Sequence, residues 1–328
     1  MIFPQGDCGM DIYEEVKSYQ RIGIGGHIRP DGDCIGASLG LYFYLEKRLP
    51  EADIYVFLER PGNSFRNIPG IDCICAEEDY REWEAVDVFI ALDTVPERMG
   101  AALDLYKRAE KTINIDHHIS NQADDAMVNY VMPNASATSE LIYDVIDKSY
   151  LDEVIAQLLY IGIAHDTGVF HYSNTSPKTM RVVAELLEYD FDFPKLIDET
   201  FYEKTYLQNQ ILSRIVLDSR RYMDGRIIIG IADHKFISRY GAKKEDFEGV
   251  VNQLRITVGV ECAVFIYEKE KGQFKCSLRA SSDLVDVAKI AMEFGGGGHV
   301  RASGFDARME LAVLEDKLVE MISKQITA

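Results

Sequence analysis

Short runs of apolar residues alternate with stretches of helical spacing along the first half of the chain. The apolar runs are bounded by polar or turn-forming residues, as expected for buried strands, and lie at 21–27, 53–59, 86–93 and 111–116. Helical spacing occurs between or after them at 37–48, 101–107, 138–148, 151–163 and 177–187. Strands that alternate with helices in this way predict an α/β fold with a doubly wound parallel sheet.

The hydrophobic pattern changes after residue 193. Residues 193–218 contain no glycine and are predicted to form one long connecting helix. Strand-like segments follow at 226–232, 261–270 and 273–281, with helical segments at 285–293 and from residue 310 onward. We therefore expect an N-terminal domain over 1–192, a helical linker over 193–215 and a smaller C-terminal α/β domain over 216–328.

The chain is strongly acidic. Its 328 residues include 35 Lys and Arg against 54 Asp and Glu, which gives a net charge of −19. A protein that binds long nucleic acid needs a basic face to neutralise phosphates, and anionic membrane surfaces likewise attract basic segments. The charge therefore argues against long duplex nucleic acid and membranes as partners, and it restricts any nucleic-acid substrate to a short one held in a local basic pocket.

The six cysteines are scattered along the chain. They form no CxxC pair, so the sequence indicates neither a zinc knuckle nor a disulfide framework. The first fifteen residues lack the basic start and apolar core of a signal peptide, and no stretch approaches about 18 uncharged apolar residues. We expect a cytoplasmic protein with reduced thiols.

Acidic residues and histidines end or follow several of these apolar runs. Asp93 ends the run VDVFIALD, and Asp166 follows the run LLYIGIA. The run KTINID ends in Asp116, which is followed by His117 and His118. Because the carboxyl ends of parallel strands share one edge of a sheet, we expect these side chains to meet there. Mixed carboxylate and imidazole ligands suit Mn²⁺, Mg²⁺ or Fe²⁺ better than structural zinc.

Each of these residues alone has an ordinary explanation. A single aspartate after a strand is often a turn former or a helix cap. We expect His165, His171 and His234 to be ordinary histidines rather than ligands. Considered jointly, however, the acidic and imidazole groups predict a metal site.

The stretch HIRPDGDCIGAS, residues 27–38, adds three further candidate ligands. His27, Asp31 and Asp33 occur there beside a proline and two glycines. This composition predicts a turn that does not hold a regular helix, with the helix beginning near Ala37. Gly32 is expected to give the backbone room to curl around an ion.

The segment GGGGHVRASG, residues 295–304, is the second concentration of polar chemistry. Consecutive glycines, among them Gly297 and Gly298, let backbone N–H groups approach a phosphate, so we expect a phosphate-binding loop. The accompanying donor side chains are His299, Arg301 and Ser303. Arg255 in NQLR and Arg279 in SLRAS either add to this site or are ordinary surface cations.

Together these motifs resemble those of the DHH phosphoesterases that carry the DHH-associated C-terminal domain. The motifs are HIRPDGD, ALDT, IDHH, DTGVFHYSNTSP and GGGGHVRASG, and they occur in the family's order over about residues 10–320. Within that superfamily the chain looks most like bacterial enzymes that degrade very short RNA (nanoRNA) and also dephosphorylate pAp. The resemblance implies an active site in the cleft between the two domains.

The resemblance also implies a site for two divalent ions, with Mn²⁺ expected first and Mg²⁺, Co²⁺ or Fe²⁺ as alternatives. The family pattern gives two overlapping ligand sets: His27, Asp31 and Asp93 for one ion, and Asp33, Asp93, His117 and Asp166 for the other. Asp116 is expected to orient a histidine. His118 is expected to contact the scissile phosphate or the leaving oxygen.

Substrate-binding residues are implied in both domains. His299, Arg301 and Ser303 are expected to bind the terminal phosphate of the substrate. Asn174 and Thr175 in SNTSP are expected to shape the substrate cleft. The implied activity is hydrolysis of short oligoribonucleotides to mononucleotides, and of pAp to AMP, by two-metal activation of a water. A homodimer is compatible with the resemblance.

Other functions share part of this pattern. A phosphodiesterase acting on pApA or cyclic di-AMP has the same motifs, although the sequence shows none of the membrane and sensory segments of the cyclic di-AMP enzymes. A family II inorganic pyrophosphatase shares the first four motifs but lacks GGGGH, and a processive single-strand exonuclease needs a basic track. A metal- or nucleotide-binding sensor is the non-enzymatic alternative, and metal-dependent turnover distinguishes it from the enzymes.

Overall fold

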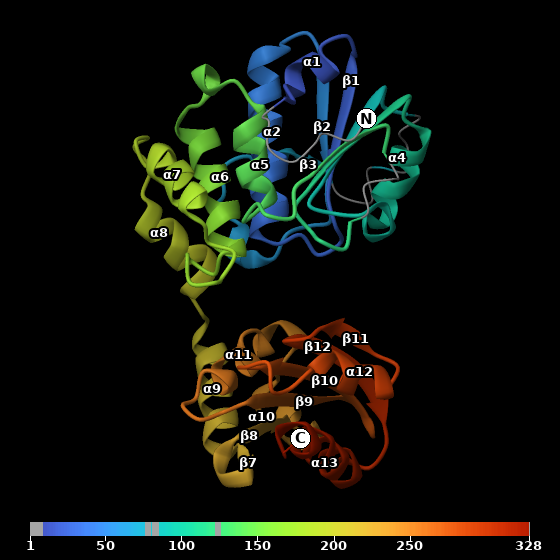
Figure 1. Ribbon diagram of the computed structural model, residues 1–328, viewed down its shortest axis with the longest axis vertical. Helices are drawn as coiled ribbons and strands as arrows, with labels where there is room; N and C mark the ends of the chain where they lie inside the picture. The colour runs from blue at the N-terminus through green and yellow to red at the C-terminus, as the bar shows by residue number, and fades with distance from the viewer. Residues whose placement is uncertain (1–8, 76–79, 81–84, 122–125, 328) are drawn as a thin grey trace. The chain divides into compact units, whose positions relative to one another are not determined.

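The computed structural model describes residues 9–75, 80, 85–121 and 126–327, and the chain divides into two compact units, Met1–Glu203 and Lys204–Ala328. Each unit has its own sheet and its own hydrophobic core (Figure 1). The expectation of an α/β fold is confirmed in both units.

The first unit is built on a parallel sheet. Its strands are β1 (Arg21–Gly25), β2 (Asp53–Phe57), β3 (Ile74–Cys75), β4 (Val88–Leu92), β5 (Lys111–Asp116) and β6 (Val128–Val131). They lie in the order β3-β2-β1-β4-β5-β6, and every neighbouring pair is parallel. This order is that of a doubly wound sheet, as predicted, with its topological switch point between β1 and β4.

Helices cover both faces of this sheet (Figure 1). One face packs against a layer formed by α2 (Gly32–Arg48), α5 (Thr138–Val145), α6 (Glu153–Asp166) and α7 (Pro177–Leu186), with α1 (Ile12–Val16) at its edge. The other face packs against α4 (Leu103–Arg108). The alternation along β4 explains the two layers, because Val88 and Ile90 enter the first core whereas Phe89 enters the second.

The loops of both units contain short 3₁₀ helices. They are η1 (Asn63–Phe65), η2 (Ile71–Cys73), η3 (Pro96–Arg98), η4 (Gly100–Ala102), η5 (Lys148–Tyr150), η7 (Met223–Gly225) and η8 (Lys244–Phe247). In the first unit, η1 and η2 lie between β2 and β3, η3 and η4 lie between β4 and α4, and η5 lies between α5 and α6.

Helix α2 begins earlier than the sequence predicts. It starts at Gly32 rather than near Ala37, so the expectation of a turn that excludes a helix is wrong. The physical reason is a local cap: the Asp31 side chain accepts hydrogen bonds from the backbone N–H groups of Asp33 and Cys34, each at 3.1 Å.

The structure gives a reason for a glycine at position 32 that the sequence did not suggest. A Cβ there would lie 2.2 Å from Cγ of His165, so glycine is required by the close approach of the imidazole ring. Gly36 has a similar role, because a Cβ at that position would lie 2.4 Å from the carbonyl oxygen of Leu158 on α6. Close contact between α2 and α6 therefore depends on glycines spaced along α2.

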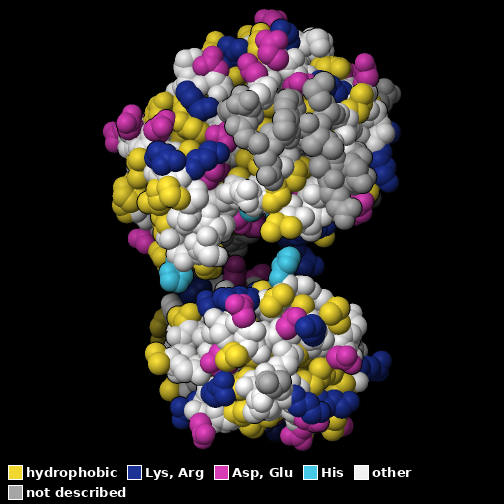
Figure 2. Space-filling model, viewed as in Figure 1, with side chains coloured by type: hydrophobic (Ala, Val, Ile, Leu, Met, Phe, Trp, Pro, Cys, Tyr) yellow, Lys and Arg dark blue, Asp and Glu magenta, His cyan; other side chains and the backbone are white. Residues whose placement is uncertain are grey.

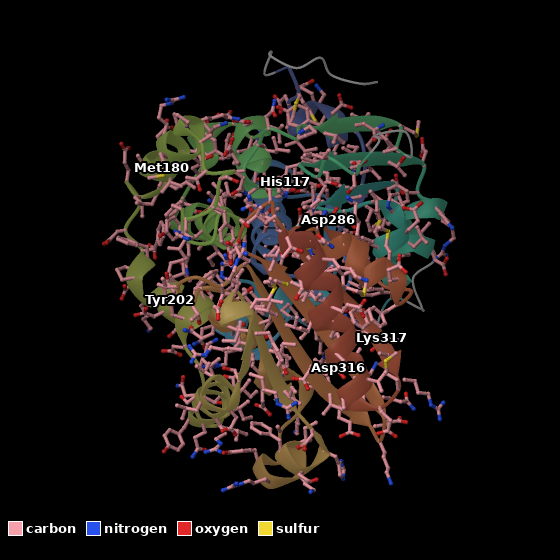
Figure 3. All side chains as sticks on the ribbon, turned by 60° about the horizontal axis from the view of Figure 1, so that its bottom comes forward. His117, Met180, Tyr202, Asp286, Asp316 and Lys317 are labelled. Carbon is pink, nitrogen blue, oxygen red and sulfur yellow. The ribbon has the colours of Figure 1, made fainter. Side chains whose placement is uncertain are left out.

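The expected single connecting helix over 193–218 is also wrong. The chain forms α8 (Phe193–Ile197), a π-helical turn η6 (Asp198–Tyr202) and then α9 (Tyr206–Asp218). The break has a local cause, because Thr205 is extended and forms a capping box with Gln208 at the start of α9. Tyr202 at the end of the π-helical turn is exposed (Figure 3).

The second unit is built on a mixed sheet in the order β11-β12-β10-β9-β8-β7. Its strands are β7 (Arg220–Tyr222), β8 (Ile227–Ala232), β9 (Cys262–Glu270), β10 (Gln273–Ala280), β11 (Gly297–His299) and β12 (Ala302–Arg308). Helices α12 (Val287–Glu293) and α13 (Leu311–Thr327) pack on one face. Helices α9, α10 (His234–Tyr240) and α11 (Val250–Arg255) pack on the other. The strands and helices predicted for this unit are present.

The glycine run takes part in a hairpin formed by β11 and β12, and its expected binding of phosphate stays a prediction. Gly297 pairs with Gly304 and Gly298 pairs with Ser303 across β11 and β12. A Cβ on Gly298 would lie 2.5 Å from the carbonyl oxygen of Ala302. At this position glycine is therefore required by the close approach of the two strands.

Charged side chains of both signs are interspersed over the face of each unit shown in Figure 2. None of the helices in the described part of the chain is long and apolar enough to cross a bilayer. Within the described ranges Cys34, Cys73, Cys262 and Cys276 are free thiols, whereas Cys8 lies outside those ranges.

We predict that Gly36→Ala destabilises the first unit by about 1–3 kcal/mol, because the added methyl group must push α2 away from the α6 backbone. Thermal unfolding of the purified variant measures the change as a lower melting temperature.

Gly62→Ala is the matched control. A Cβ on Gly62 meets nothing closer than 3.9 Å, and its φ of −61° suits alanine, so its stability should stay within about 0.5 kcal/mol of the parent. Equal melting temperatures for the two variants would contradict the packing role of Gly36.

Candidate metal centre

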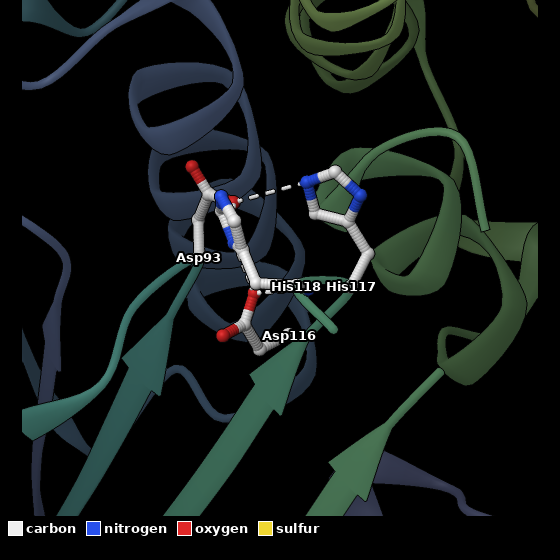
Figure 4. Close-up of side chains that lie close together, drawn as sticks. All are labelled: Asp93, Asp116, His117 and His118. Atoms are coloured by element: carbon white, nitrogen blue, oxygen red, sulfur yellow. Dashed lines mark hydrogen bonds and ion pairs between the residues drawn. The ribbon is translucent and has the colours of Figure 1, made fainter. Parts of the chain in front are cut away.

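The predicted ligands converge at the carboxyl edge of the parallel sheet. Asp93 directly follows β4, and Asp116 is the last residue of the neighbouring β5. Asp31 and Asp33 come from the start of α2 after β1, and Asp166 is the last residue of α6. Figure 4 shows the side chains of Asp93, Asp116, His117 and His118 clustered beyond the strand ends. The switch point between β1 and β4 thus lies beside the candidate site.

Asp93 is the central carboxylate. It is 2% exposed and has a left-handed backbone with φ of +57°, a conformation that costs free energy in a residue other than glycine. Its Oδ2 lies 3.4 Å from Nε2 of His27, and its Oδ1 lies 3.5 Å from Nε2 of His117. One carboxylate therefore faces two histidines, one with each oxygen.

The group around His27 contains two aspartates and a cysteine. Nε2 of His27 lies 3.7 Å from Oδ2 of Asp31 and 3.4 Å from Oδ2 of Asp93. Cys34 lies in the same group, although the sequence suggested no role for it. Burial, followed by the negative charge of Asp93, raises the pKa of the Cys34 thiol well above its usual value, so Cys34 is a poor ligand.

The group around His117 contains three carboxylates. Nε2 of His117 lies 3.3 Å from Asp166 Oδ2, 3.5 Å from Asp93 Oδ1 and 3.9 Å from Asp33 Oδ2. This nitrogen is buried and has no hydrogen-bond partner among the described residues. Ligands on adjacent corners of an octahedral Mg²⁺-sized ion lie about 3 Å apart, so a small inward movement would bring these atoms onto one ion. The donor set and the orphaned nitrogen both fit a divalent cation.

The electrostatics of the site point the same way. Burial, together with the charges of Asp93 and Asp166, raises the pKa of Asp33 well above its usual value. Burial also raises the pKa of Asp166 to about 6. Although burial acts to lower them, contacts with aspartates raise the pKa values of His27 and His117 to about 10. Without a metal the carboxylates thus share the site with imidazolium protons, which a divalent ion would replace.

His118 is held by Asp116. Nδ1 of His118 lies 2.8 Å from Asp116 Oδ1, and the other oxygen of Asp116 accepts a hydrogen bond of 2.7 Å from Asn121. The hydrogen bond with Asp116 raises the pKa of His118 above its usual value. Asp116 contacts only Nδ1 of His118, so the other ring nitrogen, Nε2, takes no part in this contact. The His118 side chain is 35% exposed. Asn121 has no sequence signal that would have identified it.

Asp33 has a second function that sequence reasoning missed. Its carboxylate accepts hydrogen bonds from the backbone N–H groups of Thr138 at 2.6 Å and Ser139 at 2.9 Å. The N-cap residue of α5 is Ala137, which has no side-chain acceptor, so Asp33 caps this helix from 105 residues away in the sequence. The Thr138 hydroxyl also donates to Asp93 Oδ1 at 3.0 Å.

The remaining candidates in the first unit lie beside Asp166. The Asn174 amide donates to the carbonyl oxygens of Ser136 at 2.9 Å and Asp166 at 3.1 Å. The Thr175 hydroxyl is buried with no partner among the described residues. His165, which the sequence left outside the ligand set, contacts the Thr200 hydroxyl at 3.0 Å, and burial lowers its pKa to about 4.

The candidates of the second unit lie on or next to the β11–β12 hairpin, except Arg255, which lies on α11. His299 and Arg301 are exposed, and Arg301 donates to Asp283 at 2.8 and 3.1 Å. Arg279 on β10 is in register with Ala302, next to the hairpin turn, and Arg255 ends α11. The Ser303 hydroxyl is buried and donates to the carbonyl of Val287 at 2.6 Å, so its one hydrogen is already used.

Comparison with known proteins gives matches over most of the chain. Residues 21–163 match the DHH family, N-terminal domain, and residues 228–328 match the DHHA1 domain. The bifunctional oligoribonuclease and PAP phosphatase NrnA of Thermus thermophilus is 30% identical over 316 residues, covering 93% of this chain and 90% of that protein. Its Bacillus subtilis namesake is 26% identical and covers 90% and 91%.

Two further similarities differ in what they cover. The cyclic-di-AMP phosphodiesterase PdeA of Listeria monocytogenes is 24% identical over 95% of this chain but only 48% of that protein. The crystal structure of an exopolyphosphatase-related protein from Bacteroides fragilis superposes with a TM-score of 0.86, at 24% identity, over 95% of this chain and 94% of the other. The latter similarity shows a shared fold.

We predict that the metal-free protein loses stability as the pH rises from 6.5 to about 10. Folding raises the pKa of His27 and of His117 from 6.5 to about 10, so each imidazolium–aspartate pair stabilises the folded state fully below pH 6.5 and is lost as the pH passes the folded-state value. Melting temperatures recorded in EDTA across this range measure the decline.

His117→Gln should flatten this decline, whereas His234→Gln should leave it unchanged because His234 is exposed in the other unit. A pH profile of His117→Gln as steep as that of the parent would contradict the assignment.

Proposed function

From the premise that this chain belongs to the DHH family and carries a DHHA1 domain, we propose that it is a divalent-metal-dependent phosphoesterase. Its proposed substrates are short oligoribonucleotides, cleaved to mononucleotides, and pAp, dephosphorylated to AMP. The observation that carries the proposal is the buried, unpartnered Nε2 of His117 among the oxygens of Asp33, Asp93 and Asp166. The names of the relatives supply the substrate class.

The candidate residues divide into two ligand sets that share Asp93. His27 and Asp31 would complete one set with it, and Asp33, His117 and Asp166 would complete the other. Mn²⁺ is the proposed ion, with Mg²⁺, Co²⁺ and Fe²⁺ as alternatives of similar ligand preference. Bound ions of this kind supply an activated water and neutralise charge on phosphate oxygens.

His118 and Asp116 form the proposed catalytic pair beside the ligands. Asp116 holds Nδ1 of His118, which fixes the orientation of the ring. The raised pKa of His118 favours the protonated form, so Nε2 would donate a proton to the scissile phosphate or the leaving oxygen. Asp116 itself is buried, and its contact with Nδ1 would stabilise the imidazolium form of His118.

The basic residues of the second unit are proposed to bind the terminal phosphate of the substrate. His299 and Arg301 on the hairpin are exposed, and the pair between Arg301 and Asp283 is a surface contact that costs little to exchange for a phosphate. Gly297, Gly298, Arg279 and Arg255 are proposed to line the same site, and Asn174 and Thr175 the catalytic side. The interdomain cleft and the homodimer stay predictions of the sequence.

Two alternatives remain distinct from this proposal. A cyclic di-AMP phosphodiesterase would have the same ligands, but the relative with that activity is matched over less than half of its length, whereas the NrnA relative from Thermus thermophilus is matched over 90%. A metal- or nucleotide-binding sensor would hold an ion without turnover. Metal-dependent hydrolysis excludes the sensor, and the preferred substrate decides between the enzymes.

We predict that the Mn²⁺-loaded protein hydrolyses short RNAs and pAp faster than pApA or cyclic di-AMP. Asp93→Asn should lower turnover by about 10³-fold, because this change removes the charge of the shared carboxylate. Release of phosphate and of mononucleotides, followed by chromatography, measures both effects.

Asp87→Asn is the matched control, since Asp87 precedes the same strand at its opposite end and accepts hydrogen bonds from Arg21. Its turnover should equal that of the parent. Dominant activity on cyclic di-AMP, or near-parental turnover by Asp93→Asn, would contradict the proposal.

We further predict that Arg301→Ala raises KM for short RNA by about 10- to 100-fold, with a smaller effect on kcat, because it removes a charged hydrogen bond to phosphate. Steady-state kinetics on a trinucleotide measure this change. Arg308→Ala, at the exposed far end of β12, the strand that begins directly after Arg301, should leave KM unchanged. An unchanged KM in both variants would remove Arg301 from the proposed site.

A further inference from the structure

Glu140 is a buried carboxylate that the proposed chemistry does not use. It is 1% exposed and lies in the first turn of α5. Its Oε2 accepts hydrogen bonds from the hydroxyls of Ser136 at 2.6 Å and Thr179 at 2.8 Å. Its Oε1 lies 3.2 Å from Nζ of Lys178. Every one of these partners comes from the segment just before α5 or from the first turn of α7.

Burying a carboxylate is costly unless its oxygens are compensated. Glu140 has hydroxyl partners on one oxygen and an ammonium group near the other, so its burial is compensated. Lys178 and Thr179 face Glu140, whereas Met180, the next residue of α7, is 47% exposed (Figure 3). Glu140 thereby ties the start of α5 to one defined face of α7.

The turn that Glu140 anchors, residues 136–140, contacts the candidate ligands directly. The backbone N–H groups of Thr138 and Ser139 donate to the Asp33 carboxylate. The Thr138 hydroxyl donates to Asp93. These contacts hold two of the carboxylates that surround His117.

The same turn reaches the backbone of Asp166, the third ligand residue, through Asn174. The Asn174 amide bridges the carbonyl oxygens of Ser136 and Asp166, at 2.9 and 3.1 Å. Asp33, Asp93 and Asp166 come from three separate segments of the chain, and the 136–140 turn is in hydrogen-bond contact with each of them, directly or through Asn174.

We propose that Glu140 is a positioning residue for the metal centre, and that it acts by fixing the 136–140 turn against the hydroxyl of Thr179 and the ammonium group of Lys178. This role rests on the proposed metal-dependent function. Glu140 touches neither ion nor substrate. It sets the distances between Asp33, Asp93 and Asp166 before the ion binds, so the free energy of ordering these ligands is supplied by folding.

The test is a calorimetric titration of metal-free protein with Mn²⁺, which reads the binding constant without any turnover. Glu140→Gln keeps the shape of the side chain but removes its charge. If the amide oxygen accepts from the hydroxyls of Ser136 and Thr179, the amide NH₂ group faces Lys178 and does not attract it. We expect Mn²⁺ to bind Glu140→Gln about 10- to 100-fold more weakly than the parent, as is typical when a residue that orients a metal ligand is changed.

Glu185→Gln is the matched control. Glu185 also joins α7 to α5, through the Tyr143 hydroxyl, but it does not contact the 136–140 turn. If loosening of the two helices alone weakened the site, both variants would lose Mn²⁺ affinity. We expect Glu185→Gln to bind Mn²⁺ as the parent does, and equal losses in both variants would overturn the proposal.

Ser136→Ala covers the case in which Glu140→Gln does not fold. It removes one hydroxyl donor to Glu140 and leaves the backbone bridge to Asn174 possible, so we expect an intermediate loss of Mn²⁺ affinity, of about 3- to 10-fold. If Glu140→Gln folds, or if Ser136→Ala is used in its place, Mn²⁺ affinity equal to that of the parent would overturn the positioning role. Absence of Mn²⁺ binding by the parent protein would instead overturn the proposed metal-dependent function.

Discussion

The first unit depends on how the Asp33 carboxylate is held. This side chain is buried between α2 and α5 and accepts hydrogen bonds from the N–H groups of Thr138 and Ser139. Ala137, the residue before α5, has no side-chain acceptor for these groups. A Cβ on Gly162 would lie 2.7 Å from Oδ1 of Asp33, so α6 also packs closely around it. One carboxylate thus links α2, α5 and α6. It also lies near Asp93 and Asp166, whose negative charges repel the charged form of Asp33 and raise its pKa.

That crowding of charge connects the fold to the proposed chemistry. In the metal-free state His27 and His117 supply the compensating charge, and their pKa values rise accordingly. A divalent ion would offer the same compensation more compactly, since it needs deprotonated imidazoles and carboxylates as ligands. The backbone of Asp93 is left-handed, and its carboxylate faces a histidine with each oxygen. Such strain is maintained by the free energy of folding and is typical of functional sites.

Much of the fold could be predicted because hydrophobic periodicity reports local structure directly. Each apolar run predicted to be a strand is one, namely β1, β2, β4, β5, β8, β9 and β10, and most predicted helices are present, but β3, β6, β7, β11 and β12 were not predicted. The errors arose where a close tertiary contact or a local helix cap outweighed the propensity that the residue types suggest. Helix α2 tolerates Gly32 and Gly36 because the close approach of His165 and of the Leu158 carbonyl requires glycine there. The helix expected over 193–218 is interrupted at the Thr205 capping box, which is a local contact.

The candidate ligands themselves could be chosen from the sequence, because parallel strands deliver the residues at their carboxyl ends to one edge and the motifs supply Asp and His there. The sequence alone determined this set of residue types and the class of metal that suits them. Only the tertiary structure decided which atoms face one another, that Asp33 caps a helix 105 residues away, and that Thr138, Asn121 and Glu140 support the site. The contacts of Thr138 with Asp33 and Asp93, and of Glu140 with Thr179, join segments distant in the chain, and such contacts leave no periodic pattern in the order of residues.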